Sequence, residues 1–278
     1  MKIRLVTDET EAPALARIPY SACPLCEGTT SVEVLQQDCR RHPLHGGDLP
    51  ATLGWRGCES CGHLFAEGYF DAAAAQRLAA RAEVVRLPGE GDIEAERRSA
   101  ARLVHRISEL RGSIEGAWLD VGTGSGALVT TAAEFGYDAA GLDTNVAVVE
   151  RLKAFGYDAG LAPIESLEGE DAFDVISFDG SLVRFPFPGQ ALAAAARLLR
   201  PGGVVFVSMP NVDSFSWKQL DARNENPFWS ELSSFHNFSR EHLYWLLRQQ
   251  GLAPVDFAVS ERYPAGMEVC AVLAEDLA

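Results

Sequence analysis

A short turn rich in glycine is the part of this chain whose residue spacing most clearly suggests chemistry. Gly122, Gly124 and Gly126 alternate with small polar residues directly after the apolar run 117–121. Glycine adopts positive φ angles without strain and lets a ligand approach the backbone closely. Helix-compatible residues follow over 127–135, and the first N–H groups of a helix attract polar or anionic groups. The pattern predicts a strand, turn and helix that bind a nucleotide-type cofactor.

Two acidic residues belong to the same neighbourhood. Asp120 lies two residues before the first glycine, and Asp143 ends a second predicted strand over 138–142. A carboxylate at the end of the second strand can accept hydrogen bonds from both hydroxyl groups of a ribose. We therefore expect Asp143 to bind the sugar of the cofactor.

The elements that would position these residues alternate between strand and helix. Further strands are predicted over 157–161, 173–178 and 204–208, a helix over 190–199, and a terminal pair of strands over 256–260 and 268–273 around the turn 263–266. Cys270 falls on an apolar position of the last strand. This alternation predicts an α/β fold with a doubly wound, mostly parallel, seven-stranded sheet covered by helices on both faces.

The ordered motifs resemble those of class I S-adenosylmethionine-dependent methyltransferases. The resemblance rests on the segment 118–129, on Asp143, on Phe-Asp-Val-Ile at 173–176 and on Leu-Leu-Arg-Pro-Gly-Gly at 198–203. It extends from about Gly116 to the C-terminus and implies a Rossmann-like methyltransferase fold. A dinucleotide oxidoreductase is the alternative for a glycine turn, but the G-x-G-x-x-G spacing is missing.

The resemblance implies that the cofactor is S-adenosylmethionine. The glycines would line its methionine and ribose, and Asp120 would orient the glycine loop or contact the cofactor's amino group. Many relatives carry an acid beside the adenine, where this chain has Leu161 and Ala162, so we expect apolar contacts there. The expected cofactor-binding set is Asp120, Gly122, Thr123, Gly124, Gly126, Asp143, Thr144 and Asp179.

Catalysis of methyl transfer to an O, N or C nucleophile needs positioning more than a nucleophilic side chain. His236 is the first candidate for a general base, because histidine titrates near neutral pH; a hydrogen-bonded structural role is the alternative. Tyr263 and Asp179 are further candidates. Many relatives carry Glu-His after the fourth strand, where this chain has Val183 and Arg184. Arg184 would suit an anionic acceptor, or else it is a solvated loop residue.

Four cysteines form two C-x-x-C pairs near the N-terminus: Cys23, Cys26, Cys58 and Cys61. Two such pairs supply the tetrahedral set of thiolates that zinc prefers. Free or redox-active thiols are the alternative, and a cytoplasmic setting argues against structural disulfides. The segment around them has too small a core to be stable alone, so zinc would supply much of its folding energy.

Other histidines and one more cysteine lie close to these pairs. Cys39, His42 and His45 fall within seven residues and could form a second metal site, a loop over the cofactor pocket, or an uninvolved loop. His63 is expected to make a local hydrogen bond. His242, inside a helix capped by Ser239, is expected to be exposed.

These features divide the chain into three parts: a zinc-ribbon-like domain over 1–70, a helical connector or lid over 71–112, and an S-adenosylmethionine-binding domain over 113–278. The connector should contain helices over 71–85 and about 92–110, the second capped by Asp92. Tyr69 and Phe70 at its start are expected to be core or lid aromatics.

Composition narrows the choice of acceptor. The chain has 278 residues and a net charge of −15, which argues against a nucleic acid partner. It contains no apolar run of about 18 residues and no signal-peptide pattern, so we expect a cytoplasmic protein without a membrane span. We therefore expect a small-molecule methyl acceptor, and the oligomeric state stays open. The alternatives are an RNA methyltransferase that clamps RNA with the zinc ribbon, and a non-catalytic module that docks a partner protein.

Overall fold

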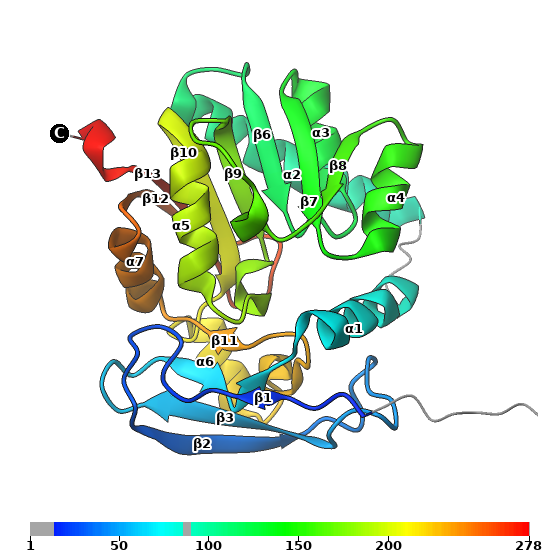
Figure 1. Cartoon of the computed structure of the whole chain (residues 1–278), viewed down its shortest axis with the longest axis vertical. Coiled ribbons are helices and arrows are strands. Elements are labelled where there is room, and N and C mark those ends of the chain that lie inside the picture. The colour runs from blue at the N-terminus through cyan, green and yellow to red at the C-terminus, as the bar shows by residue number, and fades with distance from the viewer. Residues whose placement is uncertain (1–13, 86–89, 278) are drawn as a thin grey trace, which may run out of the picture.

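The computed structural model describes residues 14–85 and 90–277. It contains a large helix-covered sheet and a smaller N-terminal part, and the carboxyl ends of the large sheet's parallel strands face the smaller part (Figure 1). Among the described residues, no helix combines the length and apolar character needed to cross a bilayer.

The large sheet has seven strands in the order β12-β13-β10-β9-β6-β7-β8. Only β13 runs antiparallel to its neighbours, so the predicted doubly wound, mostly parallel sheet is confirmed. Its strands are β6 (Ala117–Val121), β7 (Asp138–Asp143), β8 (Asp158–Leu161), β9 (Phe173–Asp179), β10 (Leu199–Pro210), β12 (Leu252–Val259) and β13 (Gly266–Leu273). The last two strands and β10 begin earlier than the apolar runs suggested.

Helices cover both faces of this sheet. On one face, α2 (Glu90–Arg111) and α3 (Ala127–Phe135) pack against a core that includes Trp118, Phe206 and Cys270. On the other face, α5 (Pro188–Leu198) and α7 (Arg240–Gln249) pack against Ile176 and Val207. A further helix that packs on this sheet, α4 (Val146–Ala154), lies against β7 and β8.

Local signals explain where these helices begin and end. The Asn145 side chain accepts a hydrogen bond from the Ala147 N–H at the start of α4, and Ser239 does the same for His242 in α7. Helix α2 begins at Glu90, so the expected cap Asp92 lies inside the helix and not at its start.

The N-terminal part is built on a four-stranded antiparallel sheet whose order is β11-β4-β3-β2. Three strands are local in sequence: β2 (Ser31–Asp38), β3 (Thr52–Cys58) and β4 (Leu64–Ala66). The fourth, β11 (His236–Asn237), comes from the C-terminal third and pairs with β4. A short ribbon of β1 (Ile18–Pro19) and β5 (Gly68–Tyr69) lies beside them. The sheet pairing therefore departs from a simple division at residues 70 and 113.

The core of the N-terminal part also draws on distant segments. Trp55 and Phe70 are buried with Leu78 of α1 (Ala72–Val85) and with Phe235. The segment that supplies Phe235 also contains α6 (Phe215–Ala222) and the 3-10 turn η3 (Pro227–Ser230), and the Trp55 indole N–H donates to the carbonyl of Trp229 at 2.8 Å. Residues 211–239 thus join the two parts. The expected core role of Phe70 agrees with this packing.

Candidate functional site

The glycine turn after β6 has the expected backbone conformation, but its glycines differ in what they face. Gly122, Gly124 and Gly126 have φ angles of 77°, 53° and 83°. A Cβ on Gly122 would lie 2.5 Å from Ser181 Cβ, and one on Gly126 would lie 2.6 Å from Leu152 Cδ2, whereas nothing lies within 4 Å at Gly124. Packing of the chain on itself therefore requires the outer two glycines, and Gly124 is the position open to a ligand.

Asp143 connects the end of β7 to this turn. Its carboxylate accepts a hydrogen bond from the Asn145 N–H at 2.8 Å and is also bonded by the backbone of Gly124. Burial raises the pKa of Asp143 above its usual range, and these bonds and the charge of Arg184 oppose that rise. Thr144 beside it is exposed. The arrangement places an acceptor group next to the open Gly124.

Asp120 is buried directly behind the turn, with 1% of its surface exposed. Ser177 donates its hydroxyl hydrogen to Asp120 at 2.6 Å, and the Trp118 indole donates to Ser177 at 2.9 Å. Burial raises the pKa of Asp120 to about 7, and the negative charge of Asp179 adds to the effect. The hydroxyl oxygen of Thr123 is also buried and has no hydrogen-bond partner among the described residues.

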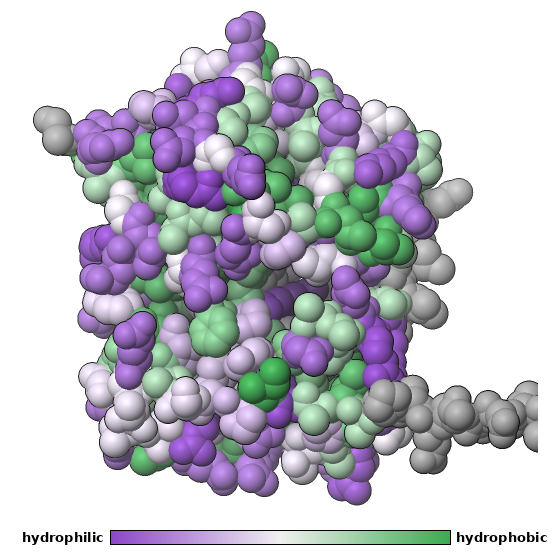
Figure 2. Space-filling view, in the orientation of Figure 1, coloured by the Kyte–Doolittle hydropathy of each residue, from purple (hydrophilic) through white to green (hydrophobic). Residues whose placement is uncertain are grey.

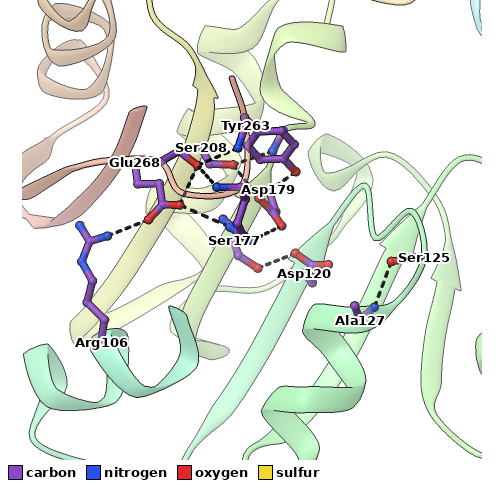
Figure 3. Close-up of polar contacts among 12 residues, drawn as sticks. Arg106, Asp120, Ser125, Ala127, Ser177, Asp179, Ser208, Tyr263 and Glu268 are labelled. Carbon is purple, nitrogen blue, oxygen red and sulfur yellow. Dashed lines mark hydrogen bonds and ion pairs between the residues drawn. The ribbon is translucent and has the colours of Figure 1, made fainter. Parts of the chain in front are cut away.

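A second polar group lies at the carboxyl end of β9 (Figure 3). Asp179 accepts hydrogen bonds from Ser208 at 2.6 Å and from the Tyr263 hydroxyl at 3.3 Å, and it pairs with Arg262 at 2.6 Å. Burial, and then the Asp179 charge, raise the pKa of Tyr263 well above its ordinary value. The structure thus brings Asp179 and Tyr263, two of the candidate bases, into contact.

Two charged residues behind this group were missed by the sequence reasoning. Arg262 Nε contacts Glu268 at 3.3 Å, and Glu268 also pairs with Arg106 of α2 at 2.8 Å. Glu268 is 8% exposed and lies near the start of β13, the antiparallel strand of the sheet. An acid at an inward position of an otherwise apolar strand was the available signal, because a buried acid needs a partner. These contacts hold Arg262 between Glu268 and Asp179.

A cavity of about 640 Å³ opens beside Tyr263, between α6 and the turn that joins β12 to β13. Its lining includes Asn211, Phe215, Val259 and Arg262. Phe215 and Val259 are 77% and 75% exposed, which is unusual for large apolar side chains. The volume falls within the range of small-molecule sites, and Asn211, the residue after β10, is part of the lining.

The two sites share one edge of the sheet. β6 and β7 end at the glycine turn and Asp143, whereas β10, β12 and β13 meet at the cavity, and β9 lies between the two groups of strands. Ser181, just after β9, packs on Gly122, and a Cβ on Gly180 would lie 3.0 Å from the Tyr263 hydroxyl. Figure 2 shows the surface hollowed between the large sheet and the N-terminal part.

His236 lies on β11 of the N-terminal sheet and is buried against the segment that follows β9. It is 1% exposed, with Nε2 at 2.9 Å from the Phe185 carbonyl and Nδ1 at 3.1 Å from His63 Nε2. Burial lowers the pKa of His236 to about 4. Both ring nitrogens are engaged, so the geometry favours the structural role over the role of base. His242 is not exposed as expected, because its Nε2 bonds the Cys61 carbonyl at 2.7 Å.

The four cysteines of the two C-x-x-C pairs converge. Their sulfur atoms all lie within 4.8 Å of one another, with Cys23 to Cys61 at 3.9 Å and Cys26 to Cys58 at 3.5 Å. A tetrahedral zinc with Zn–S bonds of about 2.3 Å requires sulfur separations of about 3.8 Å. The four thiols therefore fit a zinc ion.

Among the described residues, no second group of this kind includes Cys39, His42 or His45. The Cys39 thiol contacts the Ser230 carbonyl, and His42 Nε2 lies 3.5 Å from Glu231. The loop that contains them packs on the N-terminal part and on η3.

Arg184 ends the 3-10 turn η2 (Leu182–Arg184) and is exposed. Its charge acts on Asp143, Tyr263 and Glu231 alike. Arg184 is therefore close enough to Asp143, Tyr263 and Glu231 to act electrostatically on all three.

The fold and this pair of sites define a methyltransferase domain, and comparison with known proteins agrees. A family model described as "Methyltransferase domain" matches residues 93–256, so the chain belongs to this family. A ubiquinone biosynthesis O-methyltransferase of Bordetella avium is 34% identical over 114 residues, which cover 38% of this chain and 47% of that protein. One of Pectobacterium carotovorum is 32% identical over 131 residues and covers 41% and 55%. The chain spans about half the length of these relatives.

Solved structures support the fold. Magnesium protoporphyrin IX methyltransferase of Synechocystis, with bound S-adenosylhomocysteine, has a TM-score of 0.57 at 14% identity and covers 73% of this chain and 99% of that chain. The 1,6-didemethyltoxoflavin-N1-methyltransferase of Burkholderia thailandensis has a TM-score of 0.52 at 20% identity and covers 77% and 96%. At these identities the similarity concerns the fold alone.

Proposed function

We propose that this protein transfers a methyl group from S-adenosylmethionine to a small-molecule acceptor. The observation that supports this most is the shared edge of the sheet, where the glycine turn and the cavity meet at the end of β9. Cofactor and acceptor bound there would face one another across Gly180, and holding two reactants in line supplies much of the rate of such a transfer.

On the cofactor side, Asp143 accepts the ribose hydroxyls and Gly124 lets the cofactor approach the backbone. Leu161 at the end of β8 is 47% exposed, which suits an apolar contact with the adenine. Asp120 orients the turn from behind.

On the acceptor side, the cavity holds the acceptor between the exposed side chains of Phe215 and Val259. Tyr263, which lines the cavity, orients the accepting atom, and Asp179, which accepts a hydrogen bond from the Tyr263 hydroxyl at 3.3 Å, is the candidate to receive a proton. The relatives are named as O-methyltransferases, which favours oxygen as the accepting atom. Arg184 can attract an acceptor that carries a negative charge.

We further propose that Cys23, Cys26, Cys58 and Cys61 bind one structural zinc ion, as their sulfur separations allow. The ion would hold the two hairpins of the N-terminal part together. No step of the methyl transfer needs it.

Native mass spectrometry of the purified protein, with and without S-adenosylmethionine, tests both proposals. One zinc and one cofactor per chain are the expected masses. A chain that takes up no cofactor at millimolar concentration would refute the methyltransferase proposal, and a chain without zinc after purification with zinc present would refute the metal site. If Asp143→Ala loses cofactor uptake and Asp138→Asn, a substitution of an exposed residue, keeps it, the cofactor binds at the glycine turn beside Asp143.

A further inference from the structure

The segment that follows β9 is held by its carbonyl groups. Three carbonyls of the segment 182–187 accept hydrogen bonds from outside it: Val183 from the Phe235 N–H at 2.8 Å, Phe185 from His236 Nε2 at 2.9 Å, and Pro186 from the Tyr20 hydroxyl at 2.9 Å. Tyr20 belongs to the N-terminal part, and His236 lies on the strand that completes its sheet. The N-terminal part therefore contacts this segment through several bonds.

The same segment is joined to both reactant sites. Ser181, the residue before it, donates its hydroxyl hydrogen to the Val121 carbonyl at 2.5 Å and packs against Gly122. Arg184, inside it, acts electrostatically on Asp143 and Tyr263. A displacement of the segment would therefore move Ser181, which packs against the glycine turn, and would also move the positive charge of Arg184.

The histidines on the other side of this contact form a fixed chain of hydrogen bonds. Because the Phe185 carbonyl can only accept, His236 Nε2 carries a hydrogen, and His236 Nδ1 must then accept from His63 Nε2. His63 is fully buried and follows Cys61 by two residues. The imidazole of His236 is thus held on one side by His63, which lies beside the C-x-x-C pair Cys58 and Cys61. On the other side it donates to the Phe185 carbonyl of the segment.

Tyr20 is oriented by aromatic neighbours. Its ring centroid lies 5.0 Å from Tyr69, 5.7 Å from Phe65 and 5.9 Å from Phe187. Phe187 belongs to the segment itself, so the Tyr20 ring and its hydroxyl both hold the segment in place.

We propose that Tyr20 and His236 are positioning residues through which the N-terminal part sets the shape of the cofactor-binding cleft, meaning the space beside the glycine turn and Asp143. They act on the segment 182–187 and touch neither reactant. The proposal rests on the proposed function for what the cleft binds, but the restraint on the segment is a property of the chain alone.

Hydrogen–deuterium exchange and calorimetry with S-adenosylhomocysteine test this on the full chain. The variants are Tyr20→Phe, which removes one hydroxyl, and His236→Leu, with His236→Gln as a rescue that can still donate to the Phe185 carbonyl. Tyr137→Phe is the control for the loss of a tyrosine hydroxyl that contacts no residue of the segment, because the Tyr137 hydroxyl donates to the Ser113 carbonyl at 2.9 Å and contacts the side chains of Ser108 and Arg111.

We expect faster exchange of the Arg184 and Phe185 amides in Tyr20→Phe and His236→Leu; in the parent these amides bond the Ser181 and Leu182 carbonyls. Binding of S-adenosylhomocysteine should weaken by up to about tenfold, because the free energy of the one lost hydrogen bond is the upper limit of its effect on the affinity. His236→Gln should restore both values towards the parent, and Tyr137→Phe should change neither.

Unchanged exchange and affinity in Tyr20→Phe, with a melting temperature lowered as in Tyr137→Phe, would overturn the proposal, because Tyr20 would then only stabilise the fold. Faster exchange with unchanged affinity would overturn the claim about the cleft. Tyr20→Phe decides the question even if His236→Leu does not fold. If the parent chain binds no S-adenosylhomocysteine, the proposed function fails, whereas the exchange experiment still decides whether the segment is held.

Discussion

Replacing Asp120 by asparagine should make the protein more stable relative to the parent as the pH rises from 5 to 8. The carboxyl group is buried behind the glycine turn, and its hydrogen-bond donor is the Ser177 hydroxyl. Burial raises the pKa of Asp120 to about 7. Asparagine has nearly the same shape, keeps an oxygen for Ser177 and never ionises.

The direction and size of this change in stability follow from the different proton affinities of Asp120 in the folded and unfolded chain. An unfolded aspartate has a pKa of about 4, so between pH 4 and 7 the folded chain keeps a proton that the unfolded chain has released. The free energy of unfolding of the parent therefore falls with rising pH, by about 1.4 kcal/mol for each pH unit, until pH 7. The Asp120→Asn variant does not lose stability in this way, because asparagine does not ionise. The difference in unfolding free energy between variant and parent should shift by about 3 kcal/mol in favour of the variant between pH 5 and pH 8.

Urea unfolding at several pH values between 5 and 8 measures this difference. Any fixed cost of burying the asparagine NH₂ group, about 1–3 kcal/mol, cancels in the comparison between pH values. Asp138→Asn is the control, because Asp138 is exposed at the start of β7, and its substitution should change stability little at any pH. A difference between Asp120→Asn and the parent that stays constant across the pH range would refute the reasoning.

Three further substitutions address the cofactor, the metal and the acceptor. Asp143→Ala should weaken S-adenosylmethionine binding by about 2 kcal/mol or more, since a charged acceptor for two hydroxyls is lost; unchanged affinity in calorimetry would exclude Asp143 from that role. Cys58→Ser should abolish the one-to-one zinc content measured by mass spectrometry and lower the melting temperature; retained stoichiometric zinc would contradict the four-cysteine site. Tyr263→Phe should reduce turnover of an acceptor and leave S-adenosylhomocysteine affinity within about twofold, and a variant with parental turnover would show that Tyr263 does not orient the acceptor.

Much of the large sheet could be predicted because its signals are local. The apolar run of β6, the glycine turn and the helix that follows lie within twenty residues, and Ser239 marks the start of α7 by itself. Asp143 could be placed beside the turn because the carboxyl ends of neighbouring parallel strands meet at one edge. The four cysteines converge as their C-x-x-C spacing predicted.

The parts that sequence reasoning missed depend on contacts between distant residues. The pairing of β11 with β4 joins positions about 170 residues apart, and a two-residue strand has no periodicity to reveal it. His242 looked like an exposed helix residue because nothing local indicates that the Cys61 carbonyl lies 2.7 Å from its ring. Arg262 was missed for the same reason, since its partner Asp179 lies on β9, whereas Glu268 stood out locally as an acid on an apolar strand but its partner Arg106 on α2 could not be predicted.

The electrostatics of the site bear on which acceptors can react. Burial lowers the pKa of His236 to about 4, Asp179 is paired with Arg262, and the pKa of Tyr263 is raised, so none of the three candidate bases is strong and free near neutral pH. Methyl transfer at this site should then depend on the acidity of the acceptor itself. In a series of phenols of similar size, the rate at pH 7 should rise as the acceptor pKa falls towards 7, because more of each acceptor is ionised. A rate independent of acceptor pKa would mean that a protein group removes the proton, and Asp179 would be the first residue to test.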